Sequence, residues 1–84
     1  MKERIFQIIV QNRFGVLAKV SSLFSRRGCN IRSLTVFESQ EPGLSRMTIV
    51  FAEEDEKAMQ IFRQLEKLED VRRVALLSEM EHVN

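Results

Sequence analysis

The residues with the clearest chemical potential are Asn12 and Gly15, in a short loop between an apolar run and a helix-like pattern. Backbone N–H groups at a helix N-terminus lack intrahelical acceptors, and the helix dipole is positive there, so a carboxylate or phosphate is favoured. Gly15 has no Cβ, which lets a ligand approach the backbone closely. The Asn12 amide both donates and accepts hydrogen bonds, as recognition of a zwitterion requires. This loop is typical of a site for a small anion or an amino acid.

The same loop also has a purely structural interpretation. Asn is common at helix N-caps and Gly is common in turns. Asn12 could therefore cap the helix and Gly15 could turn the chain without any ligand. The loop alone leaves both interpretations open.

Hydrophobic periodicity predicts six elements that position this loop. Strands are expected over 3–11, 30–38, 45–52 and 71–77, and helices over 15–27 and from the acidic run 53–56 to Leu68. The segment Glu41-Pro42-Gly43 predicts a type II turn between the second and third strands, with Pro42 at i+1 and Gly43 at i+2. The order is therefore βαββαβ.

The apolar residues also predict which faces are buried. The first helix is expected to bury one stripe, made of Val16, Leu17, Val20, Leu23 and Phe24. In the second strand, alternation places Leu34 and Val36 on one face and Ile31, Thr35 and Phe37 on the other.

The element order predicts an α+β, ferredoxin-like fold, with an antiparallel four-stranded sheet and two helices on one face. The second sheet face then has no helical cover. Ile5, Ile9, Thr35 and Phe37 make that face partly apolar, which indicates a partner. Exposed edge strands offer a second route to association, and a core this small gains from it. We therefore expect a homodimer or higher oligomer.

Composition narrows the function classes. The 84 residues predict one domain over 1–78 with a short flexible tail over 79–84. The 13 basic and 12 acidic residues nearly balance, so no large field directs the chain to nucleic acid or to a membrane. A single cysteine fits a reducing cytoplasm, and no apolar run approaches the ~20 residues that span a bilayer. The first residues lead directly into a strand, so no signal peptide is expected.

No catalytic or metal-binding constellation is recognisable. Cys29 has no histidine nearby in sequence, and it is expected to be a small buried residue; the one histidine, His82, lies in the tail. Metal-ligand spacings, a P-loop and a dinucleotide-binding fingerprint do not occur. An RNA-recognition motif is not indicated either, because the strand 45–51 has no glycine and the chain has no Tyr or Trp. We expect a protein that is not an enzyme and holds no cofactor or metal.

Three longer motifs resemble one family. They are Asn12-x-x-Gly15-Val16-Leu17, Arg27-Gly28-x-Asn30-Ile31-x-Ser33-Leu34 and Ser45-Arg46-Met47-Thr48-Ile49. Over about 4–78 the chain resembles the ACT domain of the acetolactate (acetohydroxyacid) synthase small subunit. The first motif is common to many ACT domains, whereas the other two together are specific for this subunit.

The resemblance implies a non-catalytic regulatory subunit. Such a subunit binds the large catalytic subunit of branched-chain amino-acid biosynthesis, raises its activity and confers feedback inhibition by valine. Thiamine diphosphate, Mg and FAD would belong to that catalytic subunit. Two ACT domains would pair side by side into a continuous eight-stranded sheet, with the effector at their interface.

The resemblance also implies the valine-binding residues, which are Asn12, Gly15, Val16, Leu17, Asn30 and Ile31. Amides at 15–17 would take the α-carboxylate, and the two asparagines would bind the polar groups. Asn30 and Ile31 would lie across from the loop of the partner copy.

Two other functions stay open at this point. One is a free-standing ACT-type amino-acid sensor that regulates another protein, and the other is a dimerisation domain without a ligand. Many small subunits carry a second domain after the ACT domain, so a chain that ends at Asn84 would be a short subunit or a shortened version of one. Valine binding is expected in either case.

Overall fold

The structure, a computed structural model, describes residues 2–77; the predicted tail over 79–84 lies outside the described residues. Six elements follow in the expected order. They are β1 (Lys2–Gln11), α1 (Val16–Arg26), β2 (Ile31–Glu38), β3 (Leu44–Glu53), α2 (Asp55–Glu66) and β4 (Val71–Leu77). The strands and the first helix agree with their predicted bounds to within one residue at each end.

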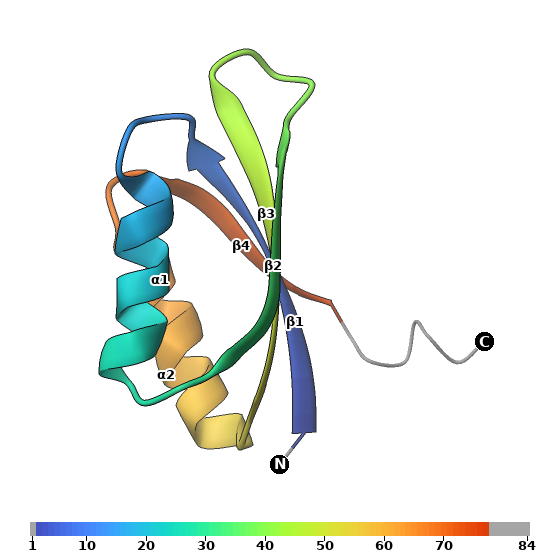
Figure 1. The fold of residues 1–84 in the computed structure, drawn as a ribbon, viewed down its shortest axis with the longest axis vertical. Helices are drawn as coiled ribbons and strands as arrows, with labels where there is room; N and C mark the ends of the chain where they lie inside the picture. The colour runs from blue at the N-terminus through green and yellow to red at the C-terminus, as the bar shows by residue number, and fades with distance from the viewer. Residues whose placement is uncertain (1, 78–84) are drawn as a thin grey trace, which may run out of the picture.

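The strands form one antiparallel sheet in the order β2-β3-β1-β4, so β2 and β4 are its edges. Both helices cover the same face of this sheet, and among residues 2–77 no helix or strand covers the opposite face, which we call the bare face (Figure 1). The predicted ferredoxin-like α+β fold is confirmed. The turn between β2 and β3 is also as predicted, because Gly43 has φ of +82° and the Leu44 amide donates to the Glu41 carbonyl at 3.3 Å.

The hydrophobic core lies between the sheet and the two helices. Phe51 of β3 is at its centre, with edge-to-face ring contacts to Phe6 at 4.9 Å and to Phe24 at 5.0 Å between centroids. Cys29 is 5% exposed beside this core, as predicted. Rings and branched side chains from β1, β3 and both helices therefore fix how the helices lie on the sheet.

The prediction that Leu17 belongs to the buried stripe of α1 is wrong. Val16 and Val20 are buried as expected, but Leu17 is 46% exposed. It lies in the first turn of the helix, beside Val36 of the edge strand, which is itself 41% exposed. The apolar stripe therefore extends past the end of the covered core.

The prediction for the faces of β2 is also wrong at one residue. Ile31 is opposite Phe51 and Leu34 is opposite Ile49, so both side chains pack against the core. An irregularity in the pairing between Ile31 and Ser33 adds one residue, Arg32, to β2. This bulge reverses the simple alternation and moves Ile31 to the helix side.

Arg4 joins the start of β1 to the start of α2. Its side chain is 9% exposed; Nε donates to the Glu53 carbonyl at 3.0 Å, and the guanidinium pairs with the Asp55 carboxylate. The hydrogen bond from Arg4, together with the charge of Lys2, holds the pKa of Asp55 below its usual value. A carboxyl group with a lowered native pKa stabilises the fold only while it is ionised.

We therefore expect Asp55→Asn to lower the urea midpoint of unfolding at pH 7. The difference from the parent should disappear as the pH falls below the unfolded-chain pKa of about 3.9 and through the lower native pKa. Glu56→Gln, in the same helical turn, is the control for loss of a carboxylate near the helix dipole. Urea titrations at pH 7 and near pH 2.5 check this; an equal loss at both pH values contradicts it.

Candidate functional site

The loop between β1 and α1 is shaped by Gly15. This residue is the N-cap of α1 and has φ of +90°, a left-handed conformation that other residues rarely adopt. A Cβ built on Gly15 would meet nothing within 4 Å. The backbone conformation, and not crowding, therefore calls for glycine, and the space next to this residue is open to a ligand.

The first turn of α1 keeps amides available. The Val16 amide donates to Arg13 at 3.3 Å and the Lys19 amide donates to Gly15 at 3.0 Å. Within residues 2–77, the backbone amides of Leu17 and Ala18 donate no hydrogen bond to a backbone carbonyl, and no side chain caps the helix. An anion placed here would meet free N–H groups and the positive end of the dipole.

Asn12 does not cap the helix, so the structural interpretation of this residue is wrong. Its backbone amide donates to the Gly43 carbonyl at 2.8 Å, which ties the loop to the β2–β3 turn. Its side chain is exposed and hydrogen-bonds to no other described residue. The amide is therefore free to bind a ligand.

The loop borders a depression of about 220 Å³. Asn12, Val16 and Leu17 line one side, and the cross-strand pair Val36 and Met47 lines the other. The last two residues were not among the predicted site residues. Alternation placed Val36 on the helix side of β2, but only the pairing of β2 with β3 shows that it reaches this loop.

Asp70 contacts the same region through both its side chain and its backbone carbonyl. Its side chain is 6% exposed and receives Lys19 Nζ at 3.0 Å and Arg13 Nη1 at 3.4 Å. Its carbonyl oxygen accepts from the Gln11 amide at 2.8 Å. These contacts hold two cations beside the N-terminus of α1, where they increase its attraction for an anion.

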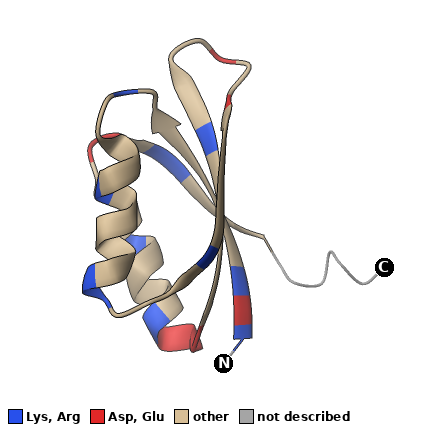
Figure 2. Cartoon of the chain, in the orientation of Figure 1, with Lys and Arg blue, Asp and Glu red and all other residues tan. Residues whose placement is uncertain are grey.

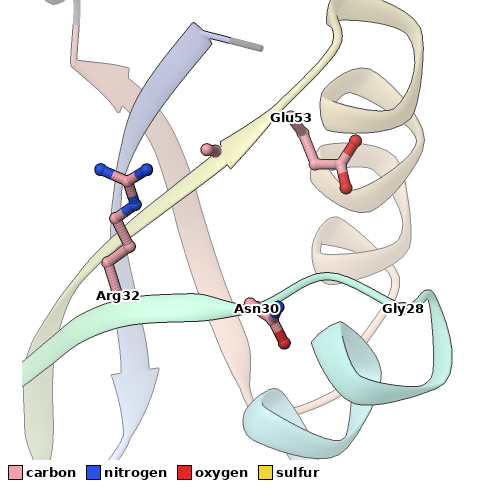
Figure 3. Close-up of a pocket in the computed structure, with 5 residues that line it drawn as sticks. Gly28, Asn30, Arg32 and Glu53 are labelled. Atoms are coloured by element: carbon pink, nitrogen blue, oxygen red, sulfur yellow. The ribbon is translucent and has the colours of Figure 1, made fainter.

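The other two predicted residues, Asn30 and Ile31, lie past the opposite end of α1. Asn30 is exposed and borders a depression of about 320 Å³, together with Arg32 and Glu53 (Figure 3). Arg32 also pairs with Glu3 at 3.4 Å. The charges of Arg32 and Glu53 beside Asn30 were not predicted, because the first comes from the bulge and the second from the end of β3.

The structure does not bring the two groups of predicted residues together in one chain. The 11 residues of α1 separate them by about 16 Å at the usual helical rise. Asn12 to Leu17 lie at one end of the helix, and Asn30 and Ile31 lie at the other. One chain thus holds the predicted residues as two separate groups.

Nothing in the described residues contradicts the prediction that the chain has no metal site. Within the described part of the chain, no three His, Cys, Asp or Glu side chains gather as a metal ion would need. His82 lies outside the described residues.

Burial raises the pKa of the Cys29 thiol, which opposes thiolate formation. Among residues 2–77, no helix is long and apolar enough to cross a bilayer.

The βαββαβ order, with both helices on one face of the sheet and a glycine loop opening the first helix, is the arrangement of an ACT-type domain. The family description "AHAS small subunit-like ACT domain" matches residues 6–73. The chain belongs to this family, as its motifs predicted.

Named relatives agree with this assignment. The chain is 46% identical over 80 residues to the acetolactate synthase small subunit of Haemophilus influenzae, covering 95% of this chain and 49% of that protein. It is 53% identical over 64 residues to the same subunit of Mycolicibacterium smegmatis, covering 76% of this chain and 38% of that protein. The crystal structure of the Thermotoga maritima small subunit matches with a TM-score of 0.88 and 41% identity, covering 95% of this chain and 50% of that one.

The chain spans about half the length of these relatives. Their names place it with the small subunits of acetolactate synthase. The expectation that the chain is not an enzyme agrees with this assignment.

Proposed function

We propose that this chain binds valine between two copies of itself and thereby regulates the thiamine-diphosphate-dependent catalytic subunit of acetolactate synthase. The observation that carries the proposal is the division of the site. Asn12 and Asn30 both have exposed side chains, they lie at opposite ends of α1, and the edge strand β2 runs between those ends.

Pairing of two β2 strands would unite the halves. β2 is an edge with mostly exposed residues, and two copies related by a twofold axis would pair it antiparallel, making an eight-stranded sheet. Asn30 at the start of one β2 would then lie near the end of the other, where Val36 borders the loop depression. The other edge, β4, carries Arg72 and Arg73, and charged residues disfavour pairing there.

Each united site would suit valine. The carboxylate would meet the amides at the start of α1, with Lys19 and Arg13 nearby. The side-chain oxygens of Asn12 and of Asn30 from the second copy would accept from the ammonium group. Leu17 and Val36 of one copy and Ile31 of the second copy would surround the isopropyl group, and Leu17 is exposed enough to make this contact.

Such a site links valine to the arrangement of the two copies. A ligand that needs groups from both copies binds only the paired state and stabilises it by mass action. A catalytic subunit that contacts both copies would respond to this change. A chain of this size has a small core, and pairing with a second copy would bury further surface and stabilise it.

Assays of acetolactate formation by a purified catalytic subunit, supplied with thiamine diphosphate, Mg and FAD, test the proposal. We expect the chain to raise turnover, valine to lower it again, and the chain alone to form no product. A free-standing amino-acid sensor would instead bind valine and leave the catalytic subunit unaffected. Product formation by the chain alone would show that it is an enzyme.

A further inference from the structure

The bare face of the sheet carries a row of four side chains near the β2–β3 turn. Strand pairing places Phe37 opposite Arg46, Arg46 opposite Ile9, and Ile9 opposite Arg73. The row therefore crosses all four strands, β2, β3, β1 and β4 in that order. Figure 2 shows basic residues on β3 and β4 on the part of the sheet toward this turn.

Ile9 lies at the centre of this row and is only 8% exposed, although neither of the two described helices covers this face. The expectation that Ile9 adds exposed apolar surface is therefore wrong. Arg46 and Arg73 are its neighbours on either side, and the aliphatic stems of long side chains cover apolar neighbours while the charged groups stay in water. The two guanidinium groups are thus presented on the surface of the sheet.

Three arginines of the sheet and the loop have carboxylate partners, whereas Arg72 of β4 faces the side-chain amide of Gln11. Arg4, Arg13 and Arg32 each pair with a carboxylate. Among the described residues, no carboxylate lies within ion-pair distance of Arg46 or Arg73. Their strands lie on either side of β1, so the backbones of the two residues are about 10 Å apart at the usual strand spacing. At this distance the two like charges repel each other. A partner with negative charge would relieve this repulsion.

Phe37 completes the row with an aromatic side chain that is 65% exposed. Arginine and the aromatic residues, phenylalanine among them, are enriched at protein interfaces. The next row, with Thr35, Thr48 and Gln7, is uncharged. The chemistry of this end of the sheet fits an acidic protein surface with an apolar side chain at its centre.

Other partners fit less well. A second copy placed face to face would bring four arginines together, which like charges oppose. Single-stranded nucleic acid binds on several stacked aromatic side chains, and this face offers Phe37 alone with a chain net charge of +1.

We propose that the row of Phe37, Arg46, Ile9 and Arg73 is the surface through which the chain binds an acidic patch of the acetolactate synthase catalytic subunit. This inference rests on the proposed function, because it names the surface that contacts the proposed partner. The row lies on β1, β3 and β4 apart from Phe37, so the β2 edge stays free to pair with a second copy.

The test is the affinity of the catalytic subunit for the double variant Arg46→Glu/Arg73→Glu, measured by biolayer interferometry at several salt concentrations. We expect binding to weaken by roughly a hundredfold, and parent binding to weaken with added salt. Arg26→Glu/Arg63→Glu is the matched control, since it makes the same charge change on exposed residues of the two helices. The control should bind like the parent.

Circular dichroism, light scattering and valine titration establish that the double variant keeps its fold, oligomeric state and effector site. If the parent binds the catalytic subunit and the double variant binds equally well, the inference is wrong while the proposed function stands. If the parent binds no catalytic subunit at all, both fail. Binding of RNA by the parent that the double variant loses would assign the row to nucleic acid and overturn the proposal.

Discussion

Gly15→Asp is expected to weaken valine binding by roughly a thousandfold. The Asp carboxylate would lie where the carboxylate of valine approaches the start of α1. Two unit charges about 4 Å apart repel by about 4 kcal/mol at an effective dielectric constant near 20. Calorimetric titration with valine measures the change.

Gly15→Asn is the matched control. Gly15 has φ of +90°, so any side chain strains the backbone, and Asn and Asp tolerate left-handed conformations better than most residues. The two variants share shape and strain but differ in charge. We expect the Asn variant to bind valine far more tightly than the Asp variant. A folded Asp variant with parent affinity would show that the ligand does not bind at this loop.

A variant with negative charges on β2, the strand proposed to pair two copies, is expected to be monomeric and therefore to lose valine binding. In Ser33→Glu/Thr35→Glu, both new side chains lie on the exposed edge strand, away from Asn12 and Gly15. Like charges on facing strands would oppose pairing by about 3 kcal/mol, roughly a hundredfold in the dimer dissociation constant. Light scattering and valine titration at equal protein concentration measure both losses.

The charge-reversed variant Ser33→Lys/Thr35→Lys provides the control for this experiment. It should also be monomeric alone, but a mixture with the Glu variant should form heterodimers and bind valine again. A Glu variant that stays monomeric and still binds valine with parent affinity would show that one chain holds the whole site.

The fold could be predicted from the sequence because its signals are local. The apolar run in β1, the spacing of Val16, Val20 and Phe24, and the Pro42-Gly43 turn each specify one element. Ile31 was assigned to the wrong face because the bulge at Arg32 depends on pairing with β3, which is a long-range property. Leu17 was assigned to the core because the spacing of apolar residues does not show how far along the helix its apolar face is buried against the sheet.

The candidate site could be predicted only in part for the same reason. Asn12 and Gly15 have a local signal, a glycine loop before a helix, whereas Asn30 entered through the family resemblance. Val36 and Glu53 could not be placed without the strand register. Arg46 and Arg73 are far apart in sequence, and only the order β3-β1-β4 sets them on either side of Ile9.

The most direct test of the central claim is calorimetric titration of the purified chain with valine, beside leucine, isoleucine, alanine and glutamate. The account predicts saturable binding of valine with one molecule per chain, because each dimer interface would contain two equivalent sites. It also predicts that Asn12→Ala and Asn30→Ala each weaken binding by about 1.5–3 kcal/mol, although the two residues lie at opposite ends of α1. No heat of binding for any amino acid of the panel would contradict the account and leave a dimerisation domain without a ligand.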